Sequence, residues 1–206
     1  MGRLHRHLFL ITFFFAVCSF LLAGGASAAR QEGKAPDFIT ITCKNTLYPD
    51  DCISCLSRHA VAIGRHKSTR RLAGAALRET LTQAKSASAF VNRLSSGDSS
   101  RRPSVSREAG AVSDCTDRLS NCVQLLWRSL WQIRHLGSRG TARYRYNLSN
   151  VVTLVSAALT DETTCLDGFP SSGVHTNTNA ALKDEIAGVS RMTSVVLALV
   201  SKIDGA

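Results

Sequence analysis

The sequence has 206 residues, of which 44% are hydrophobic and 19% are charged, and its formal net charge is +10. This length is sufficient for one domain with a substantial core. A strongly basic chain favours acidic or polyanionic partners, but the basic residues are scattered and only 6% of the chain is aromatic, which argues against a nucleic-acid-binding platform.

The N-terminal segment, residues 1–28, has the three parts of a secretory signal peptide. Basic residues begin it, residues 8–22 form a short apolar core, and Ala26 and Ala28 fit the small-x-small cleavage pattern. A membrane span needs about 20 consecutive apolar residues, and this run is shorter. We therefore expect cleavage after Ala28, export from the cell, and no association with the membrane afterwards.

Cysteine use fits an exported protein. Cys18 lies in the expected signal peptide, and six cysteines remain after it: Cys43, Cys52, Cys55, Cys115, Cys122 and Cys165. An even number in an oxidising compartment favours disulfides, although sequence alone does not fix their connectivity. Cys52 and Cys55 form a C-x-x-C pair, but a redox pair needs a βαβ setting and a zinc site needs a second closely spaced pair. Neither is visible, so we predict no metal site and no cofactor.

The remainder of the chain has the periodicity of helices. Residues 37–58 are typical of short helical or turn segments, and residues 29–61 as a whole form an N-terminal extension. The rest, 62–206, contains four long stretches with apolar residues at intervals of three or four: 62–96, 105–137, 148–166 and 176–203. Such helices bury their apolar stripes best against one another. The sequence therefore predicts an all-α fold, an up-and-down four-helix bundle with an N-terminal extension.

Catalytic motifs are not recognisable in the sequence. No histidine pairs with a nucleophile motif, and the chain has neither a phosphate-binding loop nor a His-Glu-x-x-His pair. We expect a binding or inhibitory protein and not an enzyme. Asn147 begins an Asn-Leu-Ser sequon just before the third expected helix, so it either carries a glycan or serves as a cap or turn residue.

Three segments resemble the plant pectin methylesterase inhibitor family. They are CKNTLYPDDCISCL at 43–56, SDCTDRLSNCVQLL at 113–126 and VSAALTDETTCLDGF at 155–169. The resemblance extends over nearly the whole exported chain. It implies an N-terminal helical hairpin (residues 29–61) on a four-helix bundle.

The same resemblance implies a disulfide pattern. The two expected bridges are Cys43–Cys52 and Cys115–Cys165. The second would close a loop of about 50 residues, which stabilises the fold by about 4 kcal/mol in the loop-entropy model. Cys55 and Cys122 are left over, and they either pair with each other as a third bridge or remain as free thiols.

The function that the resemblance implies is inhibition by obstruction. A secreted protein of the apoplast or cell wall would cover the pectin-binding cleft of a pectin methylesterase in a one-to-one complex. The alternative within the wider family is an inhibitor of cell-wall or vacuolar invertase. A third hypothesis, based on charge, is a wall protein that binds acidic pectin.

The expected contacts with the target lie in the third-helix motif. They are the polar residues Thr160, Asp161, Thr164 and Asp167. Each also has an ordinary alternative role, because threonines solvate or cap helices and Asp167 can simply end one. The motif alone does not separate these roles.

Overall fold

The computed structural model describes residues 37–64, 67–98, 107–169 and 177–203. Regular secondary structure in these residues is helical, with no strand among them, which confirms the predicted all-α class. Within the described helices, no stretch is long and apolar enough to cross a membrane. The expected signal peptide lies outside the described residues, so its cleavage stays a prediction.

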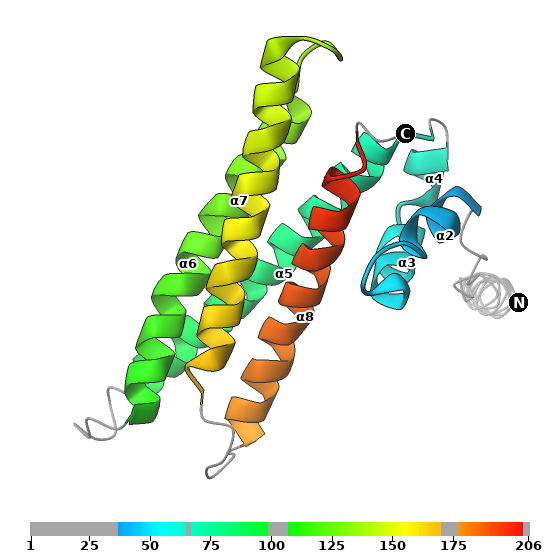
Figure 1. Cartoon of the computed structure of the whole chain (residues 1–206). Coiled ribbons are helices and arrows are strands. Elements are labelled where there is room, and N and C mark those ends of the chain that lie inside the picture. Colours follow the sequence, from blue (N-terminus) through cyan, green and yellow to red (C-terminus); the bar gives the residue numbers. More distant parts are fainter. Residues whose placement is uncertain (1–36, 65–66, 99–106, 170–176, 204–206) are drawn as a thin grey trace, which may run out of the picture. The chain divides into compact units, whose positions relative to one another are not determined.

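Four long helices make up a bundle: α5 (Thr69–Asp98), α6 (Arg107–Arg134), α7 (Ala142–Asp167) and α8 (Asn177–Val200). Each packs against the next one along the chain, and α8 closes the ring by packing against α5. Consecutive helices run in opposite directions (Figure 1). The predicted up-and-down four-helix bundle is therefore confirmed.

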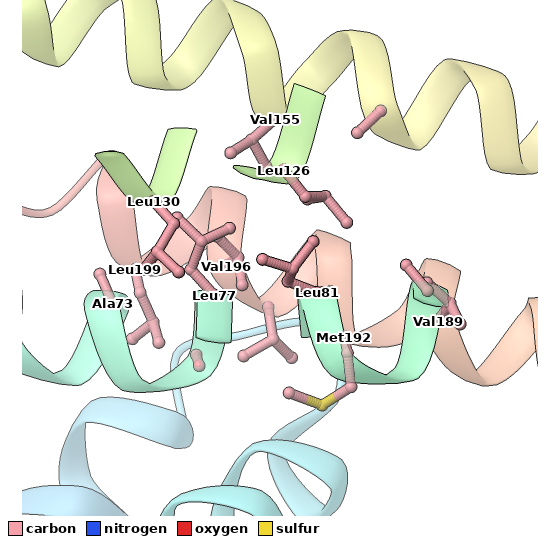
Figure 2. Close-up of a cluster of buried hydrophobic side chains, with 14 of the residues drawn as sticks. Ala73, Leu77, Leu81, Leu126, Leu130, Val155, Val189, Met192, Val196 and Leu199 are labelled. Carbon is pink, nitrogen blue, oxygen red and sulfur yellow. The ribbon is translucent and has the colours of Figure 1, made fainter. Parts of the chain in front are cut away.

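The core is built from the apolar stripes of these helices. Figure 2 shows side chains of all four helices meeting there, among them Leu77, Leu81, Leu126, Val155, Met192 and Val196. Leu77 and Leu126 have no exposed surface. Full burial of one leucine side chain contributes about 1.5–3 kcal/mol, so the four stripes supply most of the drive to form the bundle.

The first two short helices among the described residues are α2 (Asp37–Cys43) and α3 (Pro49–Ser57). The disulfide between Cys43 and Cys52 joins them into a hairpin, as the resemblance implies. The hairpin is attached to the bundle because Ile39 and Leu56 are fully buried in the common core and α3 packs against α5 and α8. Arg191 of α8 adds a 2.8 Å hydrogen bond to the Asp51 carboxylate of α3. A pair of short helices with little core of its own gains its order from such links.

The first long helix differs from the expected 62–96 element. The structure has a separate short helix, α4 (Ala60–Gly64), before α5 begins at Thr69. This short helix crosses the boundary expected between residues 61 and 62. Arg70, in the first turn of α5, donates from Nε to the Ile133 carbonyl at 3.0 Å and from a terminal nitrogen to the Arg134 carbonyl at 2.9 Å. It thereby satisfies the last carbonyls of α6, which have no partner within their own helix.

The third long helix begins six residues before the position that the sequence predicts. Thr141 caps α7, since its Oγ1 accepts a hydrogen bond from the Tyr144 backbone N–H at 3.2 Å. Tyr144 and Leu148 are buried and continue the apolar stripe toward this cap. Asn147 therefore lies inside the helix, not before it, and its amide donates to the His135 carbonyl at 3.1 Å.

A second disulfide, between Cys115 and Cys165, ties α6 to α7. Both bridges that the resemblance implies are therefore present in the structure.

The turn between α6 and α7 contains Gly137 and Gly140, with φ of 88° and 86°. This left-handed backbone is strained for any residue with a side chain, so the two glycines allow the short connection.

Candidate functional site

Three of the four expected contact residues are exposed on the last turns of α7. Thr160, Thr164 and Asp167 are spaced by four and three residues, so they share one face of the helix. The Thr160 hydroxyl donates to the Ser156 carbonyl at 3.1 Å, and the Thr164 hydroxyl donates to the Thr160 carbonyl at 2.7 Å. Their hydroxyl protons are thereby engaged, while the oxygen lone pairs stay available to accept from outside.

Asp161, the fourth expected contact, is not on this face. Its exposed fraction is 5%, and it lies between α7 and α6. One carboxylate oxygen accepts from the Asn121 amide at 2.6 Å, and the other accepts from the Arg118 guanidinium at 3.3 Å. Its role in this structure is thus to position two exposed residues of α6, which the sequence motif did not single out.

The spacing of these two α6 residues in the sequence predicts that they share one side of the helix. Arg118 and Asn121 are three apart, so they lie on neighbouring turns of one helix face. Cys122 follows them on the same helix and is buried in the bundle. Its burial fixes the rotation of α6 about its axis, so Arg118 and Asn121 lie where α6 meets α7. The pairing with Asp161 could not be predicted because it depends on how the two helices are aligned.

Beneath this surface lies a buried polar cluster. Glu162 has no exposed surface, and its Oε1 accepts from the Cys122 thiol at 3.1 Å and from the Thr193 hydroxyl at 2.7 Å. Its Oε2 has no hydrogen-bond partner among the described residues. Burial raises the pKa of Glu162 to about 7, although the hydrogen bonds from Thr193 and Cys122 act in the opposite direction.

The two leftover cysteines are free thiols in the structure. Cys55 and Cys122 are both buried and are not bonded to each other, so the third bridge is not formed. Burial raises the pKa of each thiol, with nearby carboxylates acting in the same direction. The C-x-x-C segment thus divides between a structural bridge at Cys52 and a buried thiol at Cys55.

No metal centre accompanies this cluster. Across the part of the chain that the structure describes, no three histidine, cysteine, aspartate or glutamate side chains are grouped closely enough to hold a metal ion.

The surface at the end of α7 offers hydrogen-bond acceptors, a carboxylate and a guanidinium on rigid helices. Such a surface is suited to binding another molecule.

Comparison with known proteins identifies similar sequences. The family model described as "Plant invertase/pectin methylesterase inhibitor" matches residues 37–199. Pectinesterase inhibitor 11 of Arabidopsis thaliana is 34% identical over 200 residues, which cover 95% of this chain and 96% of that protein. The 21 kDa protein of Daucus carota is 33% identical over 174 residues, covering 84% of this chain and 87% of that one.

Solved structures also resemble the fold. A crystal structure of a mutant form of a pectin methylesterase inhibitor from Arabidopsis superposes with a TM-score of 0.57 at 17% identity. The match covers 80% of this chain and 95% of that one. At this identity the likeness concerns the fold alone, and it is that of four long packed helices with short helices before them.

Proposed function

Because the chain belongs to the plant invertase/pectin methylesterase inhibitor family, we propose that it inhibits pectin methylesterases. The family is one of inhibitors, so the chain is not an enzyme. The observation on which this target rests is the near full-length identity of 34% with pectinesterase inhibitors 11 and 9 of Arabidopsis thaliana. The names of these relatives support pectin methylesterase as the partner of this chain.

The proposed mechanism is obstruction of the enzyme's substrate cleft in a one-to-one complex. The contact face would include the exposed oxygens of Thr160, Thr164 and Asp167, with Arg118 and Asn121 at its edge. Asp161 supports this face indirectly, since its carboxylate holds both α6 side chains. Because these groups project from packed helices and the threonines are already held by intrahelical hydrogen bonds, binding orders few new degrees of freedom.

An inhibition assay with one face variant tests this proposal. The oxidised protein should lower methanol release from methyl-esterified pectin when it is added to plant pectin methylesterases. Thr164→Arg should raise the inhibition constant about ten-fold or more, because a long cation replaces a small acceptor at the centre of the face. Thr82→Arg is the matched control, since Thr82 is also exposed and its hydroxyl also donates to the carbonyl four residues before it.

Two results would refute the target or the face. Full esterase activity at molar excess of inhibitor over several enzymes would reject pectin methylesterase as the target. Equal effects of Thr164→Arg and Thr82→Arg would reject the α7 face. The family description also includes invertase inhibitors, so a sucrose-hydrolysis assay on the same protein tests cell-wall or vacuolar invertase as the alternative target.

We also propose that the protein acts outside the cell, in the apoplast or cell wall. Its two disulfides support an oxidising compartment, and the expected signal peptide provides the route. Fractionation of a tagged chain should recover it in wall extracts, and retention inside the cell would contradict export. A mass decrease after deglycosylation would establish the glycan at Asn147. An unchanged mass would leave Asn147 with its hydrogen bond to the His135 carbonyl as its role.

A further inference from the structure

A basic groove lies where α5 begins and α6 ends, beside the short helix α4. Its volume is about 590 Å³. The ionisable side chains that line it are all basic: His59, Arg70, Arg71, Arg78 and Arg134. Among the described residues no carboxylate lines it, so the groove has the charge of an anion-binding site.

Of the basic groups that line this groove, His59 alone has a carboxylate partner among the ion pairs of the described residues. The nearby carboxylate of Glu79 lies outside the lining and already contacts His59 at 2.9 Å and Arg58 at 3.6 Å. Arg70 donates to the last carbonyls of α6, so these acceptors do not project toward a ligand. Arg71, Arg78 and Arg134 are exposed, which leaves their guanidinium groups accessible to a bound anion.

The basic surface continues along the seam between α5 and α6. A smaller hollow of about 240 Å³ is lined by Lys85 of α5 and by Trp127 and Arg128 of α6, among others. Since the two helices are antiparallel neighbours (Figure 1), moving from Arg78 to Lys85 on α5 corresponds to moving backward along α6 from the groove toward Trp127. The groove and the hollow are therefore successive parts of one seam.

The cations of α5 have a regular spacing. Arg71, Arg78 and Lys85 recur every seven residues, and all three are exposed. Seven residues of α-helix return to nearly the same face, with a drift of about 20°. The three cations therefore form a row about 21 Å long at 1.5 Å per residue. The part of α6 that contributes lining residues, from Val123 to Arg134, contains no acidic residue.

We infer that this seam binds a linear acidic polysaccharide, specifically a de-esterified galacturonan. A row of cations matches a polymer with repeated carboxylates better than it matches one small anion, and guanidinium groups pair with carboxylates in two-pronged geometry. Trp127, 56% exposed, offers an apolar face for a sugar ring. The choice of galacturonate rests on the proposed function, because de-esterified pectin is what a pectin methylesterase produces.

Binding of a labelled oligogalacturonate longer than about 21 Å tests the inference, with a fully methyl-esterified oligomer of equal length as the uncharged comparison. The acidic oligomer should bind, more weakly as salt rises, and the esterified one should not. The triple variant Arg71→Gln, Arg78→Gln, Lys85→Gln should weaken binding about ten-fold or more. The matched control, Lys44→Gln, Arg143→Gln, Arg145→Gln, removes three exposed charges, one directly after α2 and two on α7, and should change it by less than about two-fold.

A second variant tests the groove without changing charge. Gly74 lines the groove, and a Cβ atom placed there meets nothing within 4 Å. Gly74→Leu should fill the groove and weaken oligogalacturonate binding several-fold, while the helix itself is stabilised because leucine replaces glycine. A loss of binding in this variant therefore cannot be attributed to unfolding.

Three outcomes would overturn the inference. They are equal binding of the esterified oligomer, unchanged binding by the triple variant of Arg71, Arg78 and Lys85 (the groove triple variant), or an equal loss of oligogalacturonate binding in the control triple variant. The groove variants should inhibit the esterase as well as the parent protein does. If the parent binds oligogalacturonate but inhibits no esterase, the proposed function fails while the seam remains a polyuronate site. The two ideas thus fail separately.

Discussion

Glu162 places a carboxyl group inside the helical core, where α6, α7 and α8 meet. Its Oε1 accepts from Cys122 and Thr193, and its Oε2 has no partner among the described residues. Removing a carboxylate from water penalises its charged form, which is why its pKa rises to about 7. The neutral acid is therefore the form that the fold prefers.

This residue makes stability depend on pH in a defined direction. The pKa of Glu162 is raised from 4.5 to about 7 on folding, so between these values the folded state binds more protons than the unfolded state. Stability is then full below pH 4.5 and declines as pH rises toward 7, by about 3 kcal/mol in all. Urea unfolding of the oxidised protein across this range should show the decline.

Two variants separate this effect from other carboxylates. Glu162→Gln stays neutral, so its free energy of unfolding should vary much less between pH 4.5 and 7. Asp167→Asn, at an exposed position, should keep the parent's slope. The same slope in Glu162→Gln as in the parent would show that another group titrates.

The free thiols make a second residue-level prediction. Cys55 and Cys122 are buried and have raised pKa values, and the thiolate is the form that reacts with alkylating agents. Iodoacetamide at neutral pH should therefore leave the native protein unlabelled and label both thiols in urea. Mass mapping that finds a Cys55–Cys122 cystine, or rapid labelling of the native protein, would contradict the structure.

How far the sequence predicts such residues depends on their partners. The Cys43–Cys52 and Cys115–Cys165 pairings follow from the resemblance. Glu162 also leaves a signal, since it occupies a stripe position four residues after Ala158 and three before Cys165. Its contact with Thr193 leaves none, because that pairing depends on the alignment of α7 with α8.

At the scale of helices and turns, two glycines should respond oppositely to alanine. A Cβ atom at either Gly74 or Gly140 meets nothing within 4 Å, but Gly140 has φ of +86° and Gly74 lies in helix α5. Gly140→Ala should therefore lower the free energy of unfolding by about 1–2 kcal/mol, from backbone strain alone. Gly74→Ala should raise it by about 1 kcal/mol through helix propensity. Urea unfolding of both variants measures this difference, and equal signs would contradict the assigned backbone geometry.

Helix boundaries show what sequence periodicity can and cannot predict. Long apolar stripes predicted all four bundle helices because burial of a stripe requires that spacing. The start of α7 was missed because Tyr144 and Thr141 lie in a polar, arginine-rich segment whose cap becomes evident only from its hydrogen bond. The break between α4 and α5 was missed because apolar residues occur on both sides of it, in α4 as alanine, valine and isoleucine and in α5 as leucine and alanine.

At the scale of the whole molecule, the two proposed binding surfaces lie on different parts of the bundle. Asp167 ends α7, whereas Arg71 lies near the beginning of α5, and these two helix ends belong to opposite ends of the antiparallel bundle (Figure 1). α7 contributes no residue to the lining of the α5–α6 groove or hollow. Both surfaces use α6, since Arg118 and Asn121 border the first and Gln124 and Trp127 line the second. Their other sides are formed by different helices, α7 for the first and α5 for the second, so a protein centred on α7 would leave the α5 side of the seam available to a polysaccharide.

This separation predicts that inhibitor and enzyme can be held together on de-esterified pectin. If both proposals hold, immobilised polygalacturonate should retain more pectin methylesterase when the inhibitor is present, because the seam would bind the polymer while the α7 face would bind the enzyme. The groove triple variant should still inhibit but lose this added retention, since its lost charges lie outside the α7 face. Thr164→Arg should itself be retained but recruit much less enzyme than the parent protein does. Loss of both properties in either variant would show that the two surfaces overlap.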